Sequence, residues 1–112
     1  MNLGQRITQI PEFKWKHGMA ARTKSDLPFI VTCPNLIDKH PPWVGASLDL
    51  DHNVNTGFLM DILWSIHDDA FLAADRVGYE SDEDELYTEW RGDDEHINCA
   101  IVRAILTVST GA

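Results

Sequence analysis

Three polar residues at alternate positions, Asp51, Asn53 and Asn55, have the types and the spacing with which a calcium-binding loop begins. Such a loop surrounds the hard cation with oxygen ligands from every second residue. The rest of the pattern is missing, because Thr56 stands where the loop needs a glycine and Ile62 where it needs a bidentate glutamate. Asparagine and aspartate are also typical helix-capping residues. We therefore interpret this segment as the start of a helix rather than as a calcium site.

A second metal hypothesis comes from His96 and Cys99, which lie three residues apart on one face of a predicted helix. No second pair completes a tetrahedral site, since the other histidines are scattered at positions 17, 40, 52 and 67. Cys99 lies at the edge of an apolar stripe, which favours a buried, inert thiol over a nucleophile. All seven glycines are isolated, so the chain has no glycine-rich phosphate loop. We expect no catalytic residue, no metal ion and no cofactor, and hence no enzyme.

The acidic residues are concentrated in the second half of the chain. Residues 1–48 contain six basic and three acidic residues, whereas residues 49–112 contain three basic and fifteen acidic ones, within a net charge of −9. Five of the acids fall in the six positions from 80 to 85. Such a surface repels a phosphate backbone, so we expect no direct contact with nucleic acid, but it suits a basic protein partner. The commoner interpretation of an acidic run is a solvated loop.

Two tryptophans are further candidates for contact with a partner. Trp43 follows Pro41 and Pro42, which favour an extended connector, and it is either a recognition element or, more commonly, a plug over a core edge. Trp64 and Met60 lie four residues apart and widen the apolar face of the predicted central helix, which then has a second surface to cover. The candidate interaction surface therefore comprises Glu80, Asp82, Glu83, Asp84, Glu85, Trp43 and Trp64.

Two amphipathic helices must position these residues. The first is predicted over Asn53–His67, where five apolar residues fall on one helical face, namely Phe58, Leu59, Ile62, Leu63 and Ile66. The second is predicted over Asp94–Ser109, because Asp93, Asp94 and Glu95 provide a cap and a favourable acidic first turn. Its apolar stripe consists of Ile97, Ala100, Ile101, Ala104, Ile105 and Val108.

Two hairpins complete the predicted fold. The first joins residues 18–24 to residues 28–33, which are rich in β-forming residues. The second joins residues 70–77 to residues 86–91 across the acidic run. Residues 70–77 could also extend the central helix, but Asp68 and Asp69 are unfavourable at a helix C-terminus, so we prefer a strand. The result is an α+β fold of the order ββαββα, in which one antiparallel sheet has both helices on one face.

The length of 112 residues corresponds to a single domain covering residues 1–112. The apolar run from Cys99 to Leu106 contains Arg103 and is too short to cross a bilayer, so we expect no membrane contact. The N-terminus lacks the apolar stretch of a secretory signal. Free thiols at Cys33 and Cys99 in a reducing cytoplasm are then the simplest interpretation.

Three segments of the sequence together resemble a group of small uncharacterised phage and prophage proteins. These are Trp15, Gly18 and Met19 near the start, residues 48–51 with Gly57 at the central helix, and residues 90–95 before the final helix. Residues 53–55 depart from that group, which has Pro-Ala-Thr there. The group has no established activity. The resemblance implies a protein that acts in the cytoplasm of a bacterial host cell.

Two classes of function follow from these observations. The first is a non-catalytic protein-binding module that acts alone or as a homodimer, and the apolar residues Trp43, Met60 and Trp64 favour it. The alternative is an acidic decoy that inhibits a nucleic-acid-binding protein of the host, and the charge of the second half favours it. A metal-dependent enzyme ranks below both. The two leading hypotheses differ in an observable, because binding by a decoy weakens with salt and an apolar contact does not.

Overall fold

The computed structural model describes residues 2–37, 39–41, 43–72, 76–80, 85–89 and 96–109. Three α-helices and six strands make up the described regular structure, together with one short 3-10 helix, η1. In chain order the elements are α1 (Leu3–Ile7), β1 (Ala20–Arg22), β2 (Pro28–Ile30), η1 (Pro34–Leu36), β3 (Ser47–Leu48), α2 (Val54–Ile66), β4 (Ala70–Leu72), β5 (Arg76–Glu80), β6 (Glu85–Glu89) and α3 (Ile97–Ser109).

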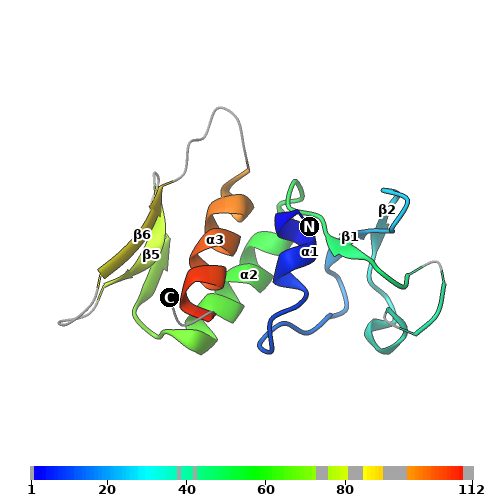
Figure 1. The fold of residues 1–112 in the computed structure, drawn as a ribbon, viewed down its shortest axis with the longest axis horizontal. Helices are drawn as coiled ribbons and strands as arrows, with labels where there is room; N and C mark the ends of the chain where they lie inside the picture. The colour runs from blue at the N-terminus through cyan, green and yellow to red at the C-terminus, as the bar shows by residue number, and fades with distance from the viewer. Residues whose placement is uncertain are drawn as a thin grey trace.

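The strands form two separate antiparallel sheets, ordered β2-β1-β3 and β4-β5-β6. The helices lie between the two sheets, so the molecule is elongated, with extents of 46 × 30 × 23 Å (Figure 1). The predicted α+β class is confirmed. The predicted single sheet with helices on one face is wrong. The two predicted hairpins belong to different sheets, and each sheet contains a third strand.

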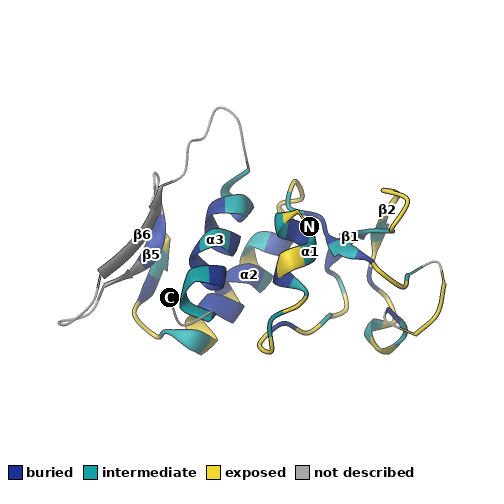
Figure 2. Ribbon diagram, in the orientation of Figure 1, coloured by how far each residue is buried: buried dark blue, intermediate teal, exposed yellow. Residues whose placement is uncertain are grey.

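The central layer can cover a sheet on either side because α3 is buried around most of its circumference. Ala100, Ile101, Val102, Ala104 and Ile105 are all fully buried. The helix packs against α2 and α1 as well as against β5 and β6. Figure 2 shows mostly buried and intermediate positions along α3, in contrast to the exposed positions in the turn between β1 and β2 and in β2. The single apolar stripe predicted from the sequence therefore included too few of the buried residues of α3.

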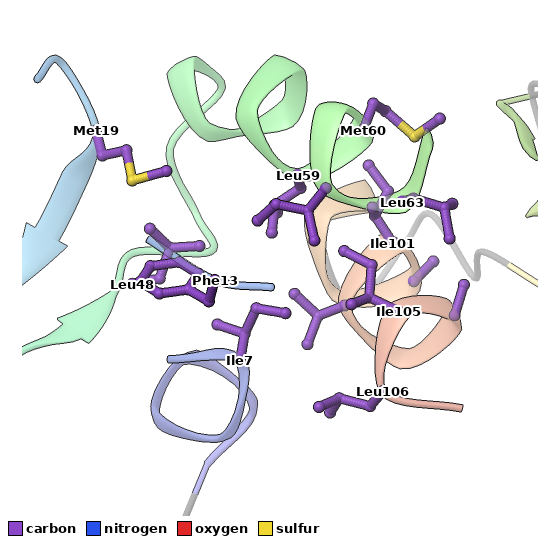
Figure 3. Close-up of a cluster of buried hydrophobic side chains, with 14 of the residues drawn as sticks. Ile7, Phe13, Met19, Leu48, Leu59, Met60, Leu63, Ile101, Ile105 and Leu106 are labelled. Carbon is purple, nitrogen blue, oxygen red and sulfur yellow. The ribbon is translucent and has the colours of Figure 1, made fainter. Parts of the chain in front are cut away.

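The main core forms where the three helices meet. Leu59 and Leu63 of α2 face Ile101 and Ile105 of α3, and Ile7 of α1 closes the cluster from below in the view of Figure 3. Full burial of aliphatic side chains of this size stabilises the fold by about 2 kcal/mol each. Leu48 of β3 and Met19, the residue before β1, belong to the same cluster, and Phe13 joins it from the segment between α1 and β1.

The helix boundaries agree with the periodicity of the sequence at most ends. The helix predicted over residues 53–67 runs from Val54 to Ile66. The final helix begins at Ile97 rather than at Asp94. His96 lies directly before the helix, and its side-chain Nδ1 accepts a hydrogen bond from the backbone N–H of Asn98 at 3.1 Å. The predicted cap at residues 93–95 falls outside the described residues. No helix in the described part of the chain is long and apolar enough to span a membrane.

The strand predictions were correct in type but not in number. The first hairpin is confirmed, with Ala21 opposite Phe29. The predicted connector over residues 34–48 contains a third strand, β3, which pairs with β1. Residues 70–77 contain β4 and the start of β5 instead of one strand, and α2 does not extend into them because His67 is in an extended conformation. The strand predicted over residues 86–91 is β6, Glu85–Glu89.

Candidate functional site

The helix α2 has an unusual distribution of polarity for a helix that is buried on one side only. It contains 13 residues, of which Asp61 is the sole charged one. The side that faces the core carries the buried residues Leu59, Met60, Ile62 and Leu63. A half-buried helix ordinarily places charged residues on its solvent side. The composition of α2 is therefore that of a helix with a second surface to cover.

The solvent side of α2 presents Val54, Gly57, Asp61 and Trp64, which we call the outer face. Their spacing of three, seven and ten residues from Val54 puts them on one side of a helix. Val54 and Trp64 are 40% and 47% exposed, values that are high for such apolar side chains. Two apolar groups thus frame a glycine and a single carboxylate.

The orientation of Trp64 is fixed by a hydrogen bond. Its indole Nε1 donates to the carbonyl oxygen of Ala70 at 2.9 Å, across the turn into β4. Satisfying the polar atom of the ring within the chain leaves the apolar part of the indole available to a partner. A ring held in this way loses little conformational entropy on binding.

Gly57 is a gap in the outer face. A Cβ placed there would meet no heavy atom within 4 Å among the described residues. Its backbone is that of an ordinary helix residue, because the glycines with positive φ in the described chain are Gly18 and Gly45. Neither a neighbouring side chain nor the backbone conformation of α2 accounts for a glycine here.

A buried polar clamp holds the segment that leads into α2. Asn55, fully buried, accepts from the N–H of Ala20 at 3.0 Å and donates to the carbonyls of Ala20 and Asp49 at 2.8 and 2.6 Å. Asn98 on α3, also fully buried, donates to the carbonyls of Leu50 and His52 at 3.1 and 3.0 Å. These two amides fix the start of α2 to β1 and to α3.

The oxygens of the calcium-like sequence have separate partners in this clamp. The Oδ1 atom of Asn55 is taken by Ala20, and that of Asn53 lies 2.6 Å from the Nε2 atom of His96. Asp51 is exposed. No group of three or more potential metal-binding side chains occurs among the described residues. The segment is therefore a helix start, as predicted, but the asparagines do not cap it: Asn53 makes no side-chain capping hydrogen bond and Asn55 bonds Ala20 instead.

An open pocket of about 550 Å³ lies beside this clamp and is lined by residues of α1, β1 and β3 together with Asn2, Asp26, residues 49–51 and Cys99. Its walls carry Arg22, whose Nε lies 3.5 Å from the Oδ2 atom of the buried Asp49. The backbone N–H of Asp51 donates to the other Asp49 oxygen at 3.0 Å. Arg22 also lies 3.4 Å from the carboxylate of Asp26, so this one guanidinium is shared between two acidic residues of the pocket.

The residues of the predicted interaction surface have different outcomes. Trp64 is exposed, as expected of a contact residue. Trp43 is half-buried and packs against the core, which agrees with the interpretation as a plug. Met60, predicted to widen the exposed apolar face, is instead 3% exposed and belongs to the core. Glu80, the last residue of β5, lies opposite Glu85, the first residue of β6, in the strand register. Asp82, Glu83 and Asp84 lie outside the described residues.

Sequence reasoning missed Val54, Gly57 and Asp61 as members of one surface with Trp64. The available signal was a 13-residue apolar helix with one charge and one central glycine. Comparison of the chain with protein-family models, with curated proteins and with solved structures finds no match in any of the three.

Proposed function

We propose that this protein is a non-catalytic protein-binding module and that it binds through the outer face of α2. The observation that carries the proposal is the exposure of Trp64 and Val54 on a helix with a single charged residue. Tryptophan is strongly enriched among the residues that dominate binding energy at protein interfaces. The proposal includes action in the cytoplasm of a bacterial host, in line with the resemblance to phage and prophage proteins.

The test is capture of partners from a bacterial lysate by the immobilised protein, read by mass spectrometry. Substituting Trp64→Ser removes the exposed ring, and Val54→Lys places a charge at the other end of the outer face. Both variants should lose the captured protein. Leu27→Ser is the matched control, because Leu27 is 62% exposed and belongs to the β1–β2 hairpin. Capture that survives both outer-face substitutions would contradict the proposal.

A second candidate function, an acidic decoy for a nucleic-acid-binding protein, is supported by the register of β5 and β6. The ladder places Glu80 directly opposite Glu85. Like charges at opposite positions destabilise an antiparallel pair, so folding alone does not favour two acids there. The sequence adds Asp82, Glu83 and Asp84 between them.

The decoy is tested by neutralising the acidic run with Asp82→Asn, Glu83→Gln, Asp84→Asn and Glu85→Gln together. Under the decoy hypothesis this variant captures less partner and the salt dependence of capture becomes shallower. If capture from the lysate is unchanged, the acidic run has no part in binding and the apolar outer face remains the binding surface.

A further inference from the structure

The outer face of α2 contains a glycine for which the chain itself gives no reason. Glycine is among the least favourable residues in a helix interior because it loses the most backbone entropy on folding. The other helical glycine that the structure describes, Gly4, is explained by close packing, since a Cβ there would overlap the carbonyl oxygen of Leu48. Gly57 has open space instead. A glycine in this setting is useful when the backbone of another molecule approaches the helix closely.

We propose that the other molecule is a second copy of this chain, and that two α2 helices cross in antiparallel orientation at Gly57. This inference rests on the proposed function and names the partner at the same surface. A two-fold axis through the crossing makes the contact self-complementary, which is the commonest symmetry of soluble oligomers. The absence of a side chain at the crossing lets the two backbones come close, and Val54 and Trp64 on either side then become covered.

Charge complementarity favours this antiparallel pairing. Asp61 and Asn53 lie four residues on either side of Gly57, about 6 Å along the axis, so the two-fold axis brings Asp61 opposite Asn53 of the partner subunit. The N-terminus of α2 has no acidic residue in its first turn, and its N-cap residue Asn53 makes no side-chain capping hydrogen bond. The positive end of the helix dipole is stabilised by a nearby anion. Each Asp61 supplies that anion to the other subunit.

Trp64 lies seven residues after Gly57, or about 10 Å along the axis, and therefore reaches past the first turn of the partner's α2. The segment before that turn is held rigid by the amides of Asn55 and Asn98. A fixed indole thus meets a fixed surface, and little further ordering is needed for binding.

The net charge of −9 sets the direction of the salt dependence. Two such chains repel each other at long range, and salt screens that repulsion beyond about 8 Å at physiological ionic strength. Moderate salt should therefore strengthen the dimer. Capture of a basic partner by an acidic decoy has the opposite dependence, because there the screened interaction is attractive.

The first experiment is cross-linking with Gly57→Cys, in a Cys33→Ser background that removes the exposed native thiol. Residues at the crossing of close helices approach the Cα separation of about 5.5–6 Å at which a disulfide forms. Mild oxidation should give a covalent dimer. Ser65→Cys in the same background is the control, because Ser65 is also exposed but its two copies lie about 24 Å apart in this geometry. Equal cross-linking of both variants, or none with Gly57→Cys, would overturn the proposal.

The second experiment is sedimentation equilibrium of the unmodified protein and of Gly57→Leu. The open space at Gly57 lets α2 accept the larger side chain without disturbing the monomer, which a thermal melt verifies. The dimer dissociation constant should rise about tenfold or more, while Leu27→Ser leaves it unchanged. If the wild-type protein remains monomeric but Trp64→Ser still abolishes capture from lysate, the homodimer proposal is wrong and the proposed protein-binding function stands. If Trp64→Ser changes neither measurement, both proposals are wrong.

Discussion

Asn55 and Ala20, 35 residues apart, form a reciprocal hydrogen-bonded pair in which the side-chain amide of Asn55 acts as a strand partner. The amide accepts from the backbone N–H of Ala20 at 3.0 Å and donates to its carbonyl at 2.8 Å. The same Nδ2 donates to Asp49, the residue after β3, at 2.6 Å. The backbone N–H of Asp49 also donates to the carbonyl of Ala20 at 3.1 Å, so this helical side chain reinforces the β1–β3 pairing just beyond the Ala21–Leu48 pair.

Replacing Asn55 should destabilise the protein strongly. In Asn55→Ala the N–H of Ala20 and the carbonyl of Asp49 lose their amide partner inside the protein. Each unsatisfied buried group costs about 1–3 kcal/mol, so the free energy of unfolding should fall by about 3 kcal/mol in a urea titration. Asn53→Ala is the control, because Asn53 is exposed and its loss should cost about 1 kcal/mol. Similar losses for both variants would show that the ladder does not depend on Asn55.

The two helical glycines should respond to alanine with opposite signs. Gly4→Ala places a Cβ against the carbonyl oxygen of Leu48, so α1 must move away from β3 and the melting temperature should fall. Gly57→Ala meets open space and gains helix propensity, so the free energy of unfolding should rise by about 0.5–1 kcal/mol. Thermal melts of the two variants side by side provide the measurement, at a protein concentration low enough for the proposed dimer to dissociate, so that only the monomer is compared. Destabilisation by Gly57→Ala would mean that something in the folded monomer already occupies the space beside it.

Charges introduced into the helical core should unfold the protein. Leu63 and Ile101 are fully buried and belong to the same cluster between α2 and α3. Leu63→Asp or Ile101→Asp buries an unpaired carboxylate, which the marginal stability of a small domain cannot offset. Circular dichroism should show the loss of cooperative melting in both variants. Trp64→Asp on the exposed side of α2 is the comparison and should retain a cooperative transition.

Protein purified without chelators should contain no stoichiometric zinc or calcium. The oxygens that begin the calcium-like pattern are used elsewhere, since Asn55 holds Ala20 and Asn53 contacts His96. If the Asn55 oxygen bound a cation, its hydrogen bond from the backbone N–H of Ala20 in β1 would be lost. Elemental analysis provides the check, and a near-stoichiometric amount of either metal would require a ligand set other than the one beginning at Asp51.

The sequence alone determined the two long helices, α2 and α3, and the type of most strands, whereas the short helix α1 (Leu3–Ile7) was not predicted. The 3.6-residue periodicity of residues 53–67 is a local property, and the helix found there begins and ends within one residue of the prediction. The β-rich hairpin around residues 20–30 is local in the same sense, because its turn and its alternation lie within a dozen residues. These features survive because tertiary contacts reinforce what the local pattern already favours.

Tertiary structure alone decided how these elements combine. The choice of two sheets over one depends on which strands meet across long sequence separations, as when Ser47 of β3 pairs with Arg22 of β1. The roles of the asparagines were equally hidden, because a polar residue in a first helical turn is expected to cap rather than to complete a distant ladder. Gly57 shows the same limit for the binding surface. Its type is visible in the sequence, but only the fold shows that nothing in the described chain packs beside it, and that exposure makes it a candidate for contact with a partner.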